Sequence, residues 1–217
     1  MDDDTAELQA ALDVPYNAAF PVQNKAYGKG RQIVARDGVA LTGPVQMSTW
    51  SAVCAPGPQG SALWQLKHTA TSGTTALVTV RNDSGQSSSI GTQPLIRGLV
   101  LHGDKASYPV GSTAIEHGLY LPELTEDKDD APALEGVLVA NCKGNGVHVG
   151  KRHNQLRGYN VKSIAHDGWS FYLDKSSDSK MSQIGAGRSL AGQVYMTNCA
   201  SMQWSQYDIW SPGGGEI

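Results

Sequence analysis

The apolar residues of this chain fall mainly into short runs that are separated by turn residues. Near the N-terminus, "TAELQAALD" places Leu8, Ala11 and Leu12 on one face of a helix. We therefore predict a short amphipathic helix from about residue 5 to 13. After it, runs such as "SALWQL" and "TTALVTVRN" lie between Gly and Pro residues, which is typical of strands.

From residue 95 onward the chain repeats itself. Three segments share an aliphatic residue, a charged residue, a glycine and a strand-like run: "LIRGLVL", "ALEGVLV" and "QLRGYNV". A second pattern lies between them in "GLYLPE", "GVHVGK", "SFYLDK" and "QVYMTN", whose central residues are 120, 148, 172 and 195, at steps of 28, 24 and 23. Two strand families that recur every 22 to 24 residues, with no helix between them, predict the stacked coils of a parallel β-helix. Neighbouring coils should then lie about 4.8 Å apart.

Alternation along these strands predicts which side chains point outward, because neighbouring residues in a strand face opposite sides. The predicted inward residues are Leu119, Leu121, Val147, Val149, Phe171, Leu173, Val194 and Met196. The outward residues of the second pattern form one column, Tyr120, His148, Tyr172 and Tyr195. The first pattern predicts another outward column, Arg97, Glu135 and Arg157, in which opposite charges alternate and Glu135 forms a structural ion pair.

The composition fits an all-β protein with many turns, since 25 of 217 residues are glycine and only 17% are charged. A net charge of −3 gives no reason to expect a nucleic-acid partner, and we interpret the basic segment Lys151-Arg152-His153 as a solvated turn. The three cysteines lack the spacing of a zinc site or a disulfide framework, so we expect free thiols. No metal and no cofactor is implied.

The chain offers no sign of a targeting or membrane segment. Its beginning, "MDDDTAELQ", is acidic and unlike a signal peptide. The longest apolar runs, such as "GVLVA", are far shorter than the roughly 20 residues of a membrane helix. We therefore expect a soluble protein without membrane insertion.

The segment "AHDGWSFYLDKSSD" holds the catalytic candidates, which are Asp174, Asp167 and His166. In a functional interpretation, Asp167 and Asp174 are acid and base carboxyls, or Asp167 orients His166. In the alternative, Asp167-Gly168 is ordinary turn chemistry, because Asp can hydrogen-bond its own backbone and Gly accepts a positive φ. The residues alone leave both interpretations open.

The outward column of rings supplies the substrate-binding candidates Tyr120, His148, Tyr172 and Tyr195, to which we add Trp169. A row of flat rings suits the apolar faces of sugar rings, and its polar edges suit their hydroxyl groups. The alternative is that the tyrosines pack under a loop or against the partners of a trimer. Trp169 could equally be a platform residue or a residue at the edge of the core.

Several segments together resemble the pectate-lyase-like right-handed β-helix superfamily, and within it the tailspike or polysaccharide depolymerase proteins of bacteriophages. They are "DDDTAELQAALD", "DGVALTGP", "LEGVLVANCKGNGVHVG", "RGYNVKSIAHDGWSFYLD" and "GQVYMTNCASMQWSQYDIW". The resemblance covers most of the chain and implies an all-β, right-handed parallel β-helix with a short N-terminal capping helix. It also implies a homotrimer in the virion tail, assembled in the host cytoplasm, that depolymerises a bacterial capsular or O-antigen polysaccharide. The family has no invariant triad to carry over.

These expectations combine into one continuous domain, with the capping helix and irregular coils in residues 1–94 and regular coils in residues 95–217. Because family members usually have more coils than this chain, which stops at "SPGGGEI", we expect a fragment or an unusually short member. Glycoside hydrolysis is favoured over β-elimination, since acids lie near the column of rings without an Arg/Lys cluster beside them. The alternative function is a non-catalytic carbohydrate-binding module or a structural trimer segment of a tail fibre.

Overall fold

The computed structural model describes residues 5–12, 32–34, 40–48, 52–55, 62–66, 71–81, 94–124, 127 and 131–210. This part of the chain contains helix α1 (Thr5–Leu12), a 3₁₀ turn, η1 (Lys105–Ser107), and two sheets. The six-stranded sheet consists of β3 (Val45–Ser48), β6 (Thr74–Arg81), β9 (Ile115–Leu121), β11 (Val147–Val149), β13 (Trp169–Asp174) and β15 (Gly192–Thr197). The ten-stranded sheet consists of β1 (Gln32–Val34), β2 (Ala40–Gly43), β4 (Ala52–Cys54), β5 (Ala62–Leu66), β7 (Leu95–Arg97), β8 (Leu99–His102), β10 (Ala133–Ala140), β12 (Arg157–Ile164), β14 (Lys180–Gly187) and β16 (Gln203–Trp210).

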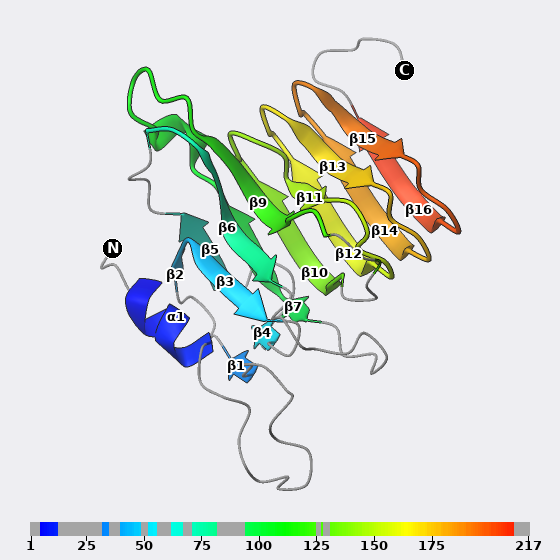
Figure 1. The fold of residues 1–217 in the computed structure, drawn as a ribbon, viewed down its shortest axis with the longest axis horizontal. Coiled ribbons are helices and arrows are strands. Elements are labelled where there is room, and N and C mark those ends of the chain that lie inside the picture. Colours follow the sequence, from blue (N-terminus) through cyan, green and yellow to red (C-terminus); the bar gives the residue numbers. More distant parts are fainter. Residues whose placement is uncertain are drawn as a thin grey trace, which may run out of the picture.

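Every strand pair in both sheets is parallel, and the chain passes from one sheet to the other and back. Thus β11, β13 and β15 lie in the six-stranded sheet, and β12, β14 and β16 follow them in the ten-stranded one. Figure 1 shows these strands stacked side by side in sequence order. Each coil therefore adds one level to the stack, which confirms the predicted parallel β-helix with a short N-terminal helix.

The predicted register of the six-stranded sheet is confirmed. Leu119, Val147, Phe171 and Val194 are neighbours on consecutive strands. The next position along these strands aligns the four outward residues, Tyr120, His148, Tyr172 and Tyr195. The separation of about two dozen residues therefore does place equivalent side chains above one another.

The predicted register of the ten-stranded sheet is wrong at one strand. Glu135 lies beside Arg97 as expected, and their side chains form an ion pair at 3.8 Å. The other neighbour of Glu135 is Tyr159, however, and not Arg157. Arg157 instead lies between Ala133 and Lys180, two positions from the expected level.

A column of left-handed backbone explains this error. Residues with positive φ interrupt the strand pairing at equivalent positions, and they are Gly98, Gly136, Asn160, Gln183 and Gln206. Glycine and asparagine tolerate this conformation best. Asn160 is therefore the equivalent of Gly136, whereas Gly158 is glycine for another reason: a Cβ at Gly158 would collide with the Met181 side chain.

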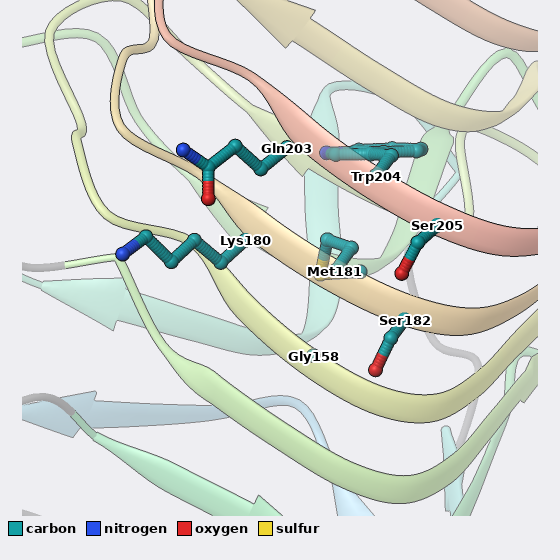
Figure 2. Close-up of a pocket in the computed structure, with 7 residues that line it drawn as sticks. All are labelled: Gly158, Lys180, Met181, Ser182, Gln203, Trp204 and Ser205. Carbon is teal, nitrogen blue, oxygen red and sulfur yellow. The ribbon is translucent and has the colours of Figure 1, made fainter.

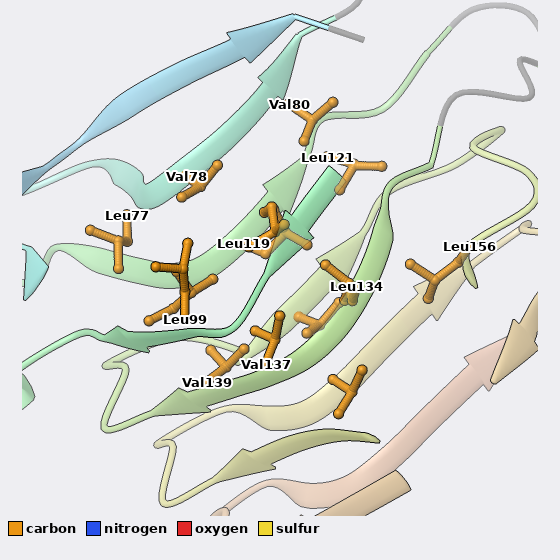
Figure 3. Packing of buried hydrophobic residues seen from close by; sticks show 14 of the residues in the cluster. Leu77, Val78, Val80, Leu99, Leu119, Leu121, Leu134, Val137, Val139 and Leu156 are labelled. Atoms are coloured by element: carbon orange, nitrogen blue, oxygen red, sulfur yellow. The ribbon is translucent and has the colours of Figure 1, made fainter. Parts of the chain in front are cut away.

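The core lies between the two sheets. Figure 3 shows side chains of both, such as Leu119 of β9 and Val137 of β10, in the space that the coils enclose. Leu119, Val147 and Phe171 are fully buried, and burying each such side chain contributes roughly 1.5–3 kcal/mol. Met196, predicted to point inward, is 37% exposed, because β15 has no further strand beyond it among the described residues.

Helix α1 covers one end of the stack, as predicted. Leu8 and Leu12 are buried against the core, and the Gln9 side chain pairs with the backbone of β3. Gln9 Oε1 accepts a hydrogen bond from the Gln46 N–H at 2.7 Å, and Gln9 Nε2 donates to the Gln46 carbonyl at 3.2 Å. The helix thereby occupies the polar edge of β3. No described helix is long and apolar enough to cross a membrane.

Candidate functional site

The outward residues of β9, β11, β13 and β15 form a continuous row of rings, which we call the aromatic strip: Tyr120, His148, Tyr172 and Tyr195. Each ring contacts the next. The centroid distances are 5.1 Å for Tyr120–His148, 4.6 Å for His148–Tyr172 and 4.8 Å for Tyr172–Tyr195. The last pair is stacked with an interplanar angle of 11°. The strand spacing of about 4.8 Å sets this periodicity.

Asn145 fixes which nitrogen of His148 carries the proton. Asn145 Oδ1 accepts a hydrogen bond from the Trp169 N–H at 2.8 Å, so its Nδ2 group is the one that faces His148. Asn145 Nδ2 therefore donates to His148 Nδ1, also at 2.8 Å. Burial lowers the pKa of His148 to about 4, although the charge of Asp174 acts in the opposite direction. Neutral His148 thus carries its proton on Nε2 and offers a donor rather than a base.

His117 packs against the strip and supports this arrangement. Its ring lies 4.6 Å from that of His148 and 5.2 Å from that of Tyr120, and it is almost fully buried. His117 Nδ1 accepts a hydrogen bond from the Asn145 N–H at 2.9 Å. Burial, with a smaller contribution from His148, lowers the pKa of His117 to about 3. His117 is therefore neutral at physiological pH.

Asp174 lies beside the strip, at the end of β13. It is two positions after Tyr172 and therefore faces the same side of the sheet. Its Oδ1 is buried and has no hydrogen-bond partner among the described residues. The pKa of Tyr172 is raised by burial, by the Asp174 carboxylate and by Tyr195, in that order of importance. Of the three catalytic candidates, Asp174 is the one that the structure brings to the strip.

The other two catalytic candidates lie at the turn before β13. His166 is fully buried: its Nδ1 accepts from the Cys142 N–H at 3.2 Å, and its Nε2 donates to Ser163 Oγ at 3.0 Å. Burial lowers its pKa to about 3. Asp167 is partly exposed and pairs with Lys105 Nζ at 2.7 Å. Within the described residues neither contacts a ring of the strip, and the hydrogen-bond partners of the His166 ring are Cys142 and Ser163 and not Asp167.

Trp169 extends the strip toward the last coil. Its ring centroid lies 5.2 Å from that of Tyr195. The ring also covers Gly192, where a Cβ would approach Trp169 Cε3 to 2.7 Å. Trp169 is half-buried: its ring packs over Gly192 and also borders the strip. It therefore has features of both roles that the sequence left open, a platform residue and a residue at the edge of the core.

The sequence reasoning missed His117 and Asn145 as parts of the site. A signal for both is present, because each of the first three strip residues has a ring or amide residue three positions earlier. These pairs are His117 with Tyr120, Asn145 with His148, and Trp169 with Tyr172. The ion pair between Glu123 and Lys151 (3.2 Å), which follows β9 and β11, was likewise not anticipated.

A cleft of about 630 Å³ adjoins the strip at the end that α1 covers. Gln9, Gln46, Thr79 and Tyr120 are among its lining residues. In the register of the sheet, Thr79 is the neighbour of Tyr120, and Gln46 is the neighbour of Thr79. The row of outward side chains therefore continues from the rings into a cleft lined by amide and hydroxyl groups.

No metal site is evident at the strip. Among the described residues, no group of three or more His, Cys, Asp or Glu side chains is placed to hold a metal ion. The chemistry that the strip itself offers consists of aromatic faces, phenol and imidazole donors, and the Asp174 carboxylate.

Comparison with known proteins identifies the fold. No protein-family model and no curated protein sequence matches this chain. A solved structure described as a "putative glycosyl hydrolase" from Parabacteroides merdae superimposes with a TM-score of 0.59 at 11% identity, over 96% of this chain and 92% of that one. The A-module of the mannuronan C-5 epimerase AlgE4 from Azotobacter vinelandii gives a TM-score of 0.56 at 17% identity, over 95% of this chain and 55% of that one. Neither is described as a phage protein, so the tailspike assignment stays a prediction.

Proposed function

We propose that this protein binds a polysaccharide along the aromatic strip and cleaves it there. The observation that carries the proposal is the row of four contacting rings on consecutive strands, with the Asp174 carboxylate at its edge. Rings of this kind stack on the apolar faces of sugars. By their names, both structural neighbours are carbohydrate-active proteins, a glycosyl hydrolase and an epimerase of mannuronan, which supports the same substrate class.

The length of the row suits a polymer. From Gln46 through Thr79 to Tyr195 the outward column crosses six parallel strands. At about 4.8 Å per strand this is about 24 Å, which is long enough for several sugar units in a row. Oligosaccharides that extend from the rings into the cleft should therefore bind more tightly than those that cover the rings alone.

The strip recognises sugar hydroxyl groups with uncharged donors. His148 offers Nε2–H because Asn145 occupies its other nitrogen, and the low pKa of His148 keeps it neutral at pH 7. Tyr172 is a neutral phenol at pH 7, and its raised pKa keeps it so at higher pH as well. These groups hold and orient the chain, and they leave the acid–base steps of cleavage to carboxylates.

Hydrolysis with inversion would use Asp174 and a second carboxyl, for which we propose Glu123. Glu123 follows β9, and Asp174 ends β13, two strands further along the stack. Two strand spacings amount to about 9.6 Å, just above the separation of about 6.5–9.5 Å that inverting enzymes use. Glu123, whose Oε1 lies 3.2 Å from Lys151 Nζ, is assigned the role of general base. Asp174 is then the candidate general acid, which must itself bind a proton before it can deliver one to the leaving oxygen.

The finer assignment rests on the sequence resemblance. We propose a bacterial capsular or O-antigen polysaccharide as the substrate, and a homotrimer in a phage tail as the assembled form. The competing candidate is a carbohydrate-binding module without turnover. It is favoured by one observation: the Glu123 side chain is already paired with Lys151. This leaves Asp174, whose Oδ1 has no hydrogen-bond partner among the described residues, as the carboxylate available beside the rings.

The test is to incubate the protein with purified capsular and O-antigen polysaccharides, and to follow reducing ends together with the absorbance of unsaturated uronates. New reducing ends without that absorbance indicate hydrolysis, and both signals together indicate β-elimination. Asp174→Asn should lower the rate by about 100-fold or more while binding persists. Asp208→Asn, an exposed acid on β16 in the other sheet, is the matched control and should retain full activity. Binding without turnover by the unaltered protein would refute cleavage and support the binding module.

A further inference from the structure

We infer a second ligand site, which binds an anionic group on the outer face of β12, β14 and β16. We call it the cationic groove: it comprises Arg157, Lys180, Ser182, Gln203 and Ser205. Figure 2 shows Lys180 beside Gln203 and Ser182 beside Ser205, as successive strands bring them together. The site is on the ten-stranded sheet, whereas the aromatic strip is on the six-stranded one. It is therefore independent of the proposed cleavage.

The groove has a definite shape. Two outward rows cross the strands: Arg157, Lys180 and Gln203 form one, and Tyr159, Ser182 and Ser205 form the other. Between them runs the row of Gly158, Met181 and Trp204. A pocket of about 390 Å³ is lined by residues of all three rows. This volume lies within the usual range for small-ligand sites.

The charges in the groove are unbalanced. Arg157 and Lys180 are in register on adjacent strands, and like charges directly opposite each other are destabilising. Neither forms an ion pair with a carboxylate in the described part of the chain, and the Arg157 guanidinium donates to the neutral Gln155 Oε1 at 3.2 Å. Elsewhere in the molecule the contrast is clear, because Arg97 contacts Glu135 and Lys105 contacts Asp167. A bound anion would convert this repulsion into two attractions.

The polar groups around the cations are also available. The side chains of Ser182, Gln203 and Ser205 make no hydrogen bond to another described residue, and all three reach the pocket. Two cations with nearby hydroxyl and amide donors are the usual components of a site for phosphate, sulfate or carboxylate.

The neighbouring aromatic residue favours a sugar-borne anion. Tyr159 is 55% exposed and lies in register with Ser182, so a ring face borders the charged row. Two cations suffice for one anionic group at a time, and the net charge of −3 does not favour a long polyanion such as nucleic acid. The ligand class that fits is an acidic sugar unit of a polysaccharide, held by its carboxylate or phosphate.

The location of the site can be tested by amide NMR on the whole protein, titrated separately with inorganic phosphate, polygalacturonate and uncharged dextran. We expect phosphate and polygalacturonate to shift the resonances of Ser182, Gln203 and Ser205, and dextran to leave them unchanged. Shifts with phosphate alone would support the site and identify a small free anion as its ligand. The absence of shifts with both anions, or equal shifts with dextran, would overturn the inference.

Charge-removing variants test which residues are responsible. Arg157→Gln combined with Lys180→Gln should weaken anion binding in the groove by about tenfold or more, because charge-assisted hydrogen bonds are lost. Lys162→Gln is the matched control, since Lys162 is an exposed cation on β12 of the same sheet, in register with Gly185. It should bind as the unaltered protein does. An equal loss in Lys162→Gln would mean non-specific charge attraction and would contradict a defined site. Thermal unfolding of each variant verifies that it is folded.

Discussion

The two sheets share one backbone repeat, yet their outer faces carry different chemistry. On the six-stranded sheet the outward residues are rings that contact one another and are half-buried by those contacts. On the ten-stranded sheet the outward residues are charged or exposed, and examples are Arg97, Glu135, Arg157 and Lys180. Since both sheets have the same strand spacing, the residue type at each outward position alone decides what the surface can bind. We therefore expect substitutions on the two faces to alter different ligands.

The largest expected effect is a difference in stability between substitutions of an inward and an outward residue on the same strand. Phe171 and Tyr172 are neighbours on β13, but Phe171 is fully buried, and its ring centroid lies 5.5 Å from that of Trp204. Phe171→Ala should lower the free energy of unfolding by about 3–5 kcal/mol, because it leaves a cavity in the core. Tyr172→Ala should cost far less. Chemical denaturation of both variants measures the difference, and similar losses would contradict the assignment of faces.

Acidification should destabilise the fold through its buried histidines. Burial lowers the pKa of His166 to about 3, against an ordinary value near 6.5, so the unfolded chain binds the proton more readily. The contribution of His166 is fully present above pH 6.5 and is lost as the pH falls toward 3. About 3 kcal/mol of it is lost at pH 4. His117 and His148 act with the same sign. Glu116, whose pKa burial raises to about 8, acts with the opposite sign between about pH 4.5 and 8.

His166→Gln isolates one of these contributions. Its free energy of unfolding, measured by denaturant titration from pH 7 to pH 4, should fall less steeply than that of the unaltered protein, by about one proton. The variant is expected to be less stable at pH 7, because the hydrogen bonds to Cys142 and Ser163 are lost. Only the pH dependence of the free energy of unfolding tests the role of His166. If that dependence is the same in the variant and the unaltered protein, His166 does not take up a proton on unfolding.

The sequence was sufficient to predict the coil repeat and the aromatic strip, because both depend on a spacing that the residues display directly. Tyr120, His148, Tyr172 and Tyr195 stand in the predicted register. It was insufficient at Arg157, because Gly158 was aligned with Gly98 and Gly136. Gly158 makes room for the Met181 side chain, whereas the left-handed backbone conformation of Gly98 and Gly136 is adopted in this coil by Asn160. Which residue type satisfies such a backbone position depends on its neighbours in other coils, which a single sequence does not reveal.

The candidate site was predictable in part for the same reason. Asp174 lies on the face that alternation assigns to it, beside Tyr172. His166 belongs to a turn, and alternation says nothing about the direction of turn residues. Its burial is produced by Cys142, Ser163 and Ser189, which come from three different coils. Contacts of this kind become apparent only when the coils are stacked.

A moderate loss of polysaccharide binding is expected when a tyrosine ring is removed from the six-stranded sheet but not when one is removed from the ten-stranded sheet. Tyr172→Ala removes one of the two inner rings of the strip and should weaken binding of a matching polysaccharide by about tenfold, since each ring contact contributes about 0.5–1.5 kcal/mol beyond the area it buries. Tyr207→Ala is the matched control, because Tyr207 is 63% exposed and lies on β16 in the other sheet. Calorimetric titration of both variants measures the loss. Equal weakening in the two would mean that any exposed tyrosine suffices, and the strip would have no special role.

The smallest expected effects are changes in the free energy of unfolding when charge is removed from two pairs on the ten-stranded sheet. Arg97 and Glu135 are opposite charges 3.8 Å apart with half-exposed side chains, so Glu135→Gln should lower the free energy of unfolding by less than about 0.5 kcal/mol. Arg157 and Lys180 are like charges in register, and Lys180→Gln should raise it by a similarly small amount. Both differences should shrink when salt is raised to about 1 M, because the Debye length falls to about 3 Å. Denaturation in low and high salt checks the signs. Stabilisation by Glu135→Gln, or destabilisation by Lys180→Gln that persists in high salt, would mean that side-chain packing and not charge governs this face.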